Sequence, residues 1–63
     1  MNTKAIKDKL NELGYITSSI VTIQSDGTNK VSISGSVHVQ EIKDNFEVKK
    51  WDYEGNKTVF VLE

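Results

Sequence analysis

Hydrophobic residues near the N-terminus recur at helical spacing. Ile6, Leu10 and Leu13 follow one another at i, i+4 and i+7, which places them on one face of a helix over residues 3–13. Gly14 comes next, at the position where a helix commonly ends in the left-handed conformation, and the polar residues before the helix can cap its start. We therefore predict one amphipathic helix whose outer face carries charges of mixed sign.

The middle of the chain alternates between apolar and polar residues. Residues 19–25 predict a strand, and a turn follows at 26–29. Residues 31–39 alternate without a break, which predicts a second strand. Gly35 stands on the apolar face of that strand, so we expect a bulge there or a close approach by the helix.

The next segment, residues 40–45, fits two structures. We prefer a turn, because the alternation of a strand resumes at residues 46–48. Val39, Ile42 and Phe46 also lie at i, i+3 and i+7, a spacing that a second helix would use.

The C-terminal residues "VKKWDYEGNKTVFVLE" predict a hairpin, since Gly55 and Asn56 form a typical two-residue turn between two strands. This turn pairs Glu54 with Lys57, Tyr53 with Thr58, and Trp51 with Phe60. One face then carries Trp51, Tyr53, Phe60 and Leu62, and the other carries Lys50, Asp52, Val59 and Val61. A bulge near Lys49 and Lys50 would bring Phe46 and Val48 into phase with the aromatic residues.

The last strand is apolar on both faces. Either it lies inside the sheet and is covered on both sides, or one face meets another chain. We therefore expect a homodimer and take Val59 and Val61 as candidates for its interface.

Together these elements predict a single small α+β domain over residues 1–63, with an N-terminal helix packed on an antiparallel meander sheet of about four strands. The alternative is an αββαββ order with a short second helix near 39–46. The segment "IVTIQSDGTNKVSISGSV" resembles the strand pair of the BON domain, a phospholipid-associated module. That family places a clear second helix after the pair and this pattern shows none, so we carry no function over.

The amino-acid composition excludes several kinds of site and function. The chain has no cysteine and one histidine, His38, so we expect no disulfide, metal site or cofactor. Its net charge is −1 and its basic residues are all lysine, which disfavours nucleic-acid reading. His38 has no nucleophile within reach along its strand, so we expect no enzyme. With neither a signal peptide nor an apolar run of membrane length, we expect a cytoplasmic protein that does not bind a membrane.

One group of residues could bind a ligand. Aromatic side chains beside lysines can stack bases and hold phosphates, as in proteins that bind single strands. The group consists of Lys49, Lys50, Trp51, Tyr53 and Phe60. Small domains also need such aromatics for their core or for a dimer interface, and that use remains the main alternative.

We therefore predict a small non-enzymatic interaction or regulatory protein, a bacterial or phage accessory factor that forms a homodimer and binds another protein. The alternative is a module that binds single-stranded nucleic acid through the aromatic and lysine residues of its sheet.

Overall fold

The computed structural model describes residues 2–63. The elements follow in the order α1 (Thr3–Leu13), η1 (Ile16–Ser18), β1 (Ser19–Ile23), β2 (Asn29–Ser34), α2 (Val39–Asn45), β3 (Val48–Glu54) and β4 (Lys57–Leu62).

Helix α1 has the bounds that its hydrophobic spacing predicts. The Asn2 side chain accepts a hydrogen bond of 2.8 Å from the backbone N–H of Ala5 and so caps the first turn. Gly14 ends the helix in the left-handed conformation, with a φ of 87°. Ile6 and Leu10 are completely buried, so the predicted apolar face is the one that packs on the sheet.

The four strands form one antiparallel sheet in the order β1-β2-β4-β3. The predicted α+β class with an antiparallel sheet of four strands is thus confirmed. The order departs from a simple meander, because β4 lies between β2 and β3. Strands β2 and β3 consequently run in the same direction, and α2 makes the crossover between them.

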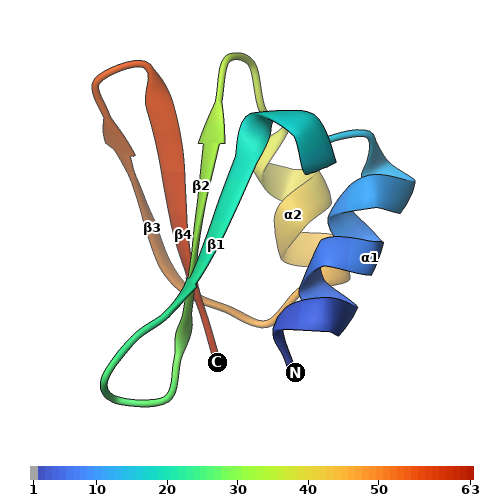
Figure 1. The fold of residues 1–63 in the computed structure, drawn as a ribbon. Coiled ribbons are helices and arrows are strands. Elements are labelled where there is room, and N and C mark those ends of the chain that lie inside the picture. Colours follow the sequence, from blue (N-terminus) through green and yellow to red (C-terminus); the bar gives the residue numbers. More distant parts are fainter. Residues whose placement is uncertain (1) are drawn as a thin grey trace.

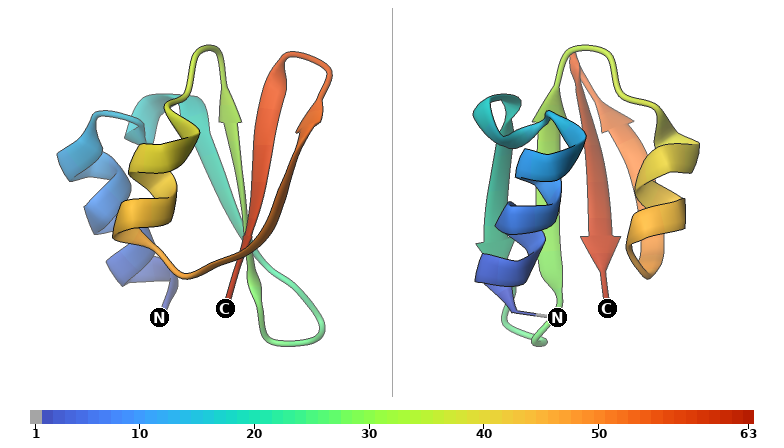
Figure 2. Two further views of the ribbon diagram at one scale, coloured as in Figure 1. Left: turned by 180° about the vertical axis from the view of Figure 1, so that it is seen from behind. Right: turned by 90° about the vertical axis from the view of Figure 1, so that its right-hand side faces the viewer.

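Both α-helices lie on the same face of the sheet, and no helix of residues 2–63 covers the other face (Figures 1 and 2). The core fills the space between helices and sheet. It consists of Ile6, Leu10, Val31, Ile33, Ile42, Phe46, Phe60 and Leu62. We call the other side of the sheet the open face.

The second strand is shorter than its alternating pattern predicts. It ends at Ser34, because Gly35 takes a positive φ of 83° and turns the chain out of the sheet. The Gly35 N–H donates to the Asn56 carbonyl at 3.2 Å. The prediction of a strand as far as residue 39 is therefore wrong. A side chain at Gly35 would point into open space, with no atom within 4 Å of its Cβ, so the expected close approach by the helix is absent too.

The preferred turn at residues 40–45 is also wrong, and the helical alternative is correct. Helix α2 occupies Val39–Asn45 and directs Ile42 into the core, where that side chain is 1% exposed. The Phe46 N–H donates to the Ile42 carbonyl at 2.9 Å, and the Phe46 ring is buried beside it. Burial of these two residues against the sheet selects the helix over the turn.

The C-terminal hairpin has the predicted register. Trp51 lies opposite Phe60, Tyr53 opposite Thr58 and Glu54 opposite Lys57. The register shifts between Val48 and Lys50, which confirms the predicted bulge.

Candidate functional site

The aromatic residues proposed as a binding group do not form an exposed platform. Phe60 is completely buried in the core. The Trp51 ring is half-buried and stacks on Phe60, with 6.3 Å between ring centroids and 28° between planes. Only Tyr53 is open to solvent, at 64% exposure, and its ring meets Trp51 edge-on at 5.2 Å. Binding of single strands by stacking needs several accessible rings, and this arrangement offers one.

The two lysines of the proposed group are separated from the aromatic rings. Lys50 pairs with Val61 and therefore points to the open face, whereas Trp51 pairs with Phe60 on the helix-covered face. Lys49 is the extra residue of the bulge. The structure thus divides the group between two faces of the sheet.

The charge of Lys49 acts instead on the turn between β1 and β2. Hydrogen bonds from the Thr28 hydroxyl and the Thr28 N–H, at 2.6 and 3.0 Å, hold the pKa of Asp26 below its usual range. The positive charge of Lys49 adds a smaller effect in the same direction. This carboxylate is fully exposed, and its bonds order a turn.

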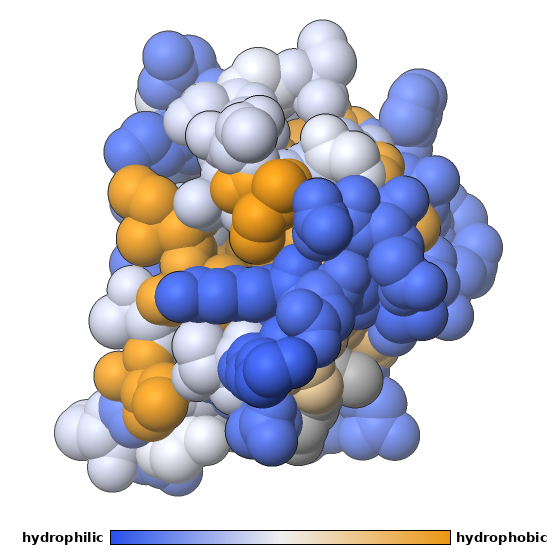
Figure 3. All heavy atoms as spheres, turned by 45° about the vertical axis from the view of Figure 1, so that its right-hand side comes forward, coloured by the Kyte–Doolittle hydropathy of each residue, from blue (hydrophilic) through white to orange (hydrophobic). Residues whose placement is uncertain are grey.

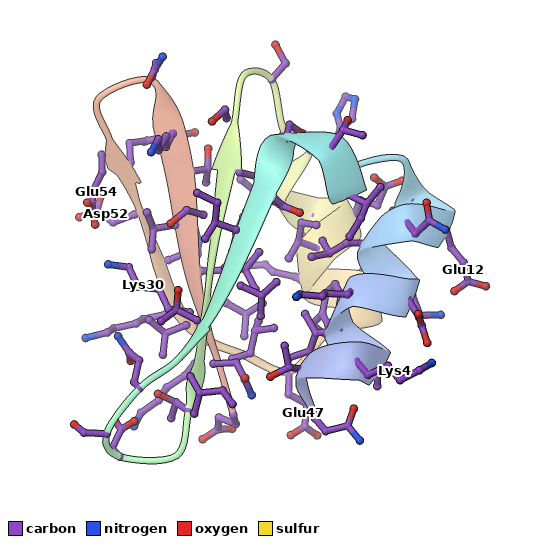
Figure 4. All side chains as sticks on the ribbon, in the orientation of Figure 1. Lys4, Glu12, Lys30, Glu47, Asp52 and Glu54 are labelled. Atoms are coloured by element: carbon purple, nitrogen blue, oxygen red, sulfur yellow. The ribbon has the colours of Figure 1, made fainter. Side chains whose placement is uncertain are left out.

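The candidate dimer residues Val59 and Val61 lie on the open face, yet they are only 6% and 9% exposed in the single chain. Lys30 and Lys50 flank Val61 in the neighbouring strands, and Asp52 lies beside Val59. Figure 4 shows the side chains of Lys30, Asp52 and Glu54 on the side of the sheet away from both helices.

A hollow of about 350 Å³ lies on this face, and its lining includes Lys30, Lys50, Val59 and Val61. The low exposure of both valines is consistent with cover from the apolar stems of the two lysines. Strand β4 is therefore internal and covered, which was one of the two alternatives for an apolar strand. A dimer interface at Val59 and Val61 stays a prediction, but the surplus apolar surface that motivated it is already buried.

A second hollow, of about 450 Å³, lies beside the end of α2. Its lining consists of Lys43, Asp44, Asn45, Phe46, Glu47, Leu62 and Glu63. This set contains no nucleophile paired with a base, and no cluster of His, Asp or Glu within residues 2–63 could hold a metal ion. His38 is exposed at the start of α2.

The two edges of the sheet differ in chemistry. Strand β3 forms one edge and carries a bulge together with four charged residues, features that discourage pairing with another strand. Strand β1 forms the other edge, and its residues Ser19–Ile23 include no charge and no proline. Two of its side chains, Ile20 and Ile23, are 61% and 65% exposed.

No strand of the described sheet pairs with the outer edge of β1. In the right-hand view of Figure 2, β1 is the outermost strand of the sheet, with η1 leading into its start and α1 in front of it. In Figure 3, hydrophobic surface shows as separate orange patches next to the blue surface of charged residues. Within the described chain, the large exposed hydrophobic residues are Ile20, Ile23 and Tyr53, so β1 holds two of them.

The backbone groups that β1 offers follow from its register with β2. The Gln24 N–H donates to the Thr28 carbonyl at 2.8 Å, in the same register that pairs Thr22 with Lys30. Hydrogen-bonded and non-hydrogen-bonded pairs alternate along an antiparallel ladder. Ile20 and Thr22 therefore bond to β2, while the N–H and C=O groups of Ser19, Val21 and Ile23 point away from the sheet. Sequence reasoning did not find this site, because local pattern does not reveal which strand is at an edge.

These features define a two-layer α+β domain with one open sheet face and one unprotected sheet edge. No protein-family model matches the chain, and comparison with curated proteins and with solved structures found no significant match. The second helix whose absence set the BON resemblance aside is present as α2, yet that resemblance has no support from a family model. No helix among residues 2–63 is both long enough and apolar enough to span a membrane.

Proposed function

We propose that the protein is a non-enzymatic interaction protein that binds an extended polypeptide segment along the free edge of β1. The observation that carries this proposal is an edge strand without charge, proline or bulge that presents outward backbone groups at Ser19, Val21 and Ile23. Natural sheets usually protect such an edge, as this one does at β3. An edge left open is a ready template for strand addition.

The side chains of β1 support the same function. Main-chain hydrogen bonds give a strand-addition complex its affinity, and side chains on alternate faces give it specificity. Ile20 faces the open side of the sheet and Ile23 the opposite side, so an added strand would meet one exposed isoleucine on each face. The cytoplasmic location expected from the sequence stays part of this proposal.

Other functions find less support among the described residues. A nucleic-acid module would need its rings and lysines on one accessible face, whereas Trp51 and Lys50 lie on opposite faces. An enzyme would need a reactive group inside one of the two hollows, and neither lining brings a nucleophile to a base.

Selection from a random decapeptide display library against the immobilised chain tests the proposal. The discriminating variant is Ile23→Pro, which removes one outward N–H from an edge position where proline is tolerated. Its matched control is Ile23→Ala, which removes the side chain and keeps the N–H. A second variant, Ile20→Lys, places a charge at an exposed edge position and leaves the core intact.

We expect enriched peptides with alternating β-branched residues that bind the unchanged chain and the Ile23→Ala control. They should bind at least tenfold more weakly to folded Ile23→Pro and to Ile20→Lys. Library selection without enrichment, or equal binding by all four chains, would overturn the proposal.

A further inference from the structure

We infer that the segment occupying the β1 edge is β1 of a second copy of this chain, paired antiparallel with Val21 on the two-fold axis. This inference rests on the proposed function, since it names the polypeptide that the edge binds. The sequence of β1 is "SIVTI". When two copies of this strand pair antiparallel and in full overlap, Ser19 lies opposite Ile23, Ile20 opposite Thr22, and Val21 opposite Val21 of the other copy.

The hydrogen-bonding groups agree with this register. The outward groups of β1 belong to Ser19, Val21 and Ile23, and in this register each of them faces another outward residue. Val21 exchanges bonds with its counterpart, and each Ser19 exchanges bonds with an Ile23, which amounts to about six backbone hydrogen bonds.

Neighbouring registers are poorer. A slip by one residue sets an outward group against an inward one, because the two kinds alternate along the strand. A slip by two residues brings Val21 opposite Ile23 or Ser19 and leaves one of the three bonded pairs without a partner inside the strand. The centred register is therefore the one that uses all five residues of β1.

The side chains are compatible with a second copy. On the open face Ile20 lies opposite Thr22 of the second copy. On the helix-covered face Ile23 lies opposite Ser19 of the second copy, so both exposed isoleucines gain a neighbour. Strand β1 has no charged residue, so this pairing brings no like charges of the strand together. A two-fold axis perpendicular to the sheet keeps the helices of both copies on one side and joins two four-stranded sheets into one.

A disulfide experiment reads the register directly, because the chain has no cysteine of its own. The variants are Ile20→Cys and Thr22→Cys, both at exposed positions of the open face. Opposed residues of a non-hydrogen-bonded pair have Cα atoms about 4.5 Å apart, within the disulfide range of about 4.4–6.8 Å. The two variants are mixed in equal amounts, equilibrated in a glutathione redox buffer, and separated by mass.

Random pairing would make the mixed disulfide half of the crosslinked product. We expect the mixed disulfide to be at least three times as abundant as the two homodimers combined. The control pairs Ile20→Cys with Asp52→Cys, an exposed position of the same face on the opposite edge strand, and should give the random distribution. An excess of either homodimer would show a different register, and a random product would show no specific pairing. Either result would overturn the inference.

Sedimentation equilibrium of the cysteine-free chain, from micromolar to millimolar concentration, supplies an independent measurement. We expect a dimer whose dissociation constant rises at least tenfold on Ile20→Lys, since a lysine at an edge strand disfavours pairing. A monomer at every concentration would overturn the inference. If display-selected peptides nevertheless bind the β1 edge, the proposed function stands with a different partner; if they do not, both proposals are overturned.

Discussion

The replacement of Ile42 by alanine tests whether α2 is a core element of the fold. Ile42 is 1% exposed and belongs to the cluster that fills the space between helices and sheet. Truncation of a buried isoleucine to alanine costs about 2–5 kcal/mol of unfolding free energy. A domain of this size seldom has more than about 3–5 kcal/mol in total, so Ile42→Ala should remove a large part of the stability.

The sign of the change in unfolding free energy shows whether Ile42 is buried or exposed. Alanine is the better helix former, so at an exposed position of α2 the same substitution would raise stability by a few tenths of a kcal/mol, roughly. Two variants complete the series. Ile42→Val should cost about 0.5–1.5 kcal/mol. Ile20→Ala makes the same chemical change at a residue that is 61% exposed and should cost less than about 1 kcal/mol.

Urea unfolding followed by Trp51 fluorescence and by far-UV circular dichroism measures these differences at one low protein concentration. Trp51 is the sole tryptophan of the chain and contacts the core, so its emission follows the loss of tertiary packing. The expected order of midpoints is unchanged chain, Ile20→Ala, Ile42→Val and Ile42→Ala, from highest to lowest. A midpoint for Ile42→Ala at or above that of Ile20→Ala would refute the assignment of Ile42 to the core.

Three further predictions concern other parts of the structure. Asn2→Ala removes the cap of α1 and should lower the unfolding free energy by about 0.5–2 kcal/mol, while the capping variant Asn2→Ser should retain most of it in urea titrations. Phe60→Ala should cost about 3–5 kcal/mol, whereas Tyr53→Ala, at an exposed ring, should leave thermal unfolding nearly unchanged. The Asp26 carboxylate has a depressed pKa in the folded chain, so its contribution is present above the unfolded value, near 3.8, and disappears as pH falls through the folded pKa. An NMR titration should find that pKa below 3.8 and closer to it in Thr28→Val; an equal or lower value in the variant would contradict the hydrogen-bond explanation.

Local sequence signals were sufficient for two parts of the fold. The Gly55-Asn56 turn specifies a two-residue hairpin, and turn length alone sets the register that places Trp51 opposite Phe60. The bounds of helix α1 were equally predictable, because its apolar spacing indicates the helical segment and Gly14 indicates its end. In both cases the deciding contacts lie within a few residues along the chain.

The middle of the chain could not be read in the same way. Residues 31–39 alternate like a strand, but Gly35 turns the chain out of the sheet after Ser34. Residues 40–45 fit both a turn and a helix, and burial of Ile42 and Phe46 in the core decides between them. That burial is a tertiary effect, which a local window does not contain.

The candidate site shows the same limit. Sequence placed Trp51, Tyr53 and Phe60 on one face correctly, but it could not say that α2 would cover part of that face and leave Tyr53 alone exposed. It also could not identify β1 as an edge, since strand order depends on the insertion of β4 between β2 and β3. The proposed interaction site follows from that order rather than from any motif.

Backbone amide exchange at β1, followed by NMR, tests the central claim most directly. In dilute solution the amides of Ile20 and Thr22 should be protected by β2, while those of Val21 and Ile23 should exchange rapidly because they point outward. At millimolar protein concentration, or with a display-selected peptide, the Val21 and Ile23 amides should become protected. Protection of these two amides in the dilute chain, or their continued rapid exchange at saturation, would contradict the account of β1 as an open edge that binds a strand.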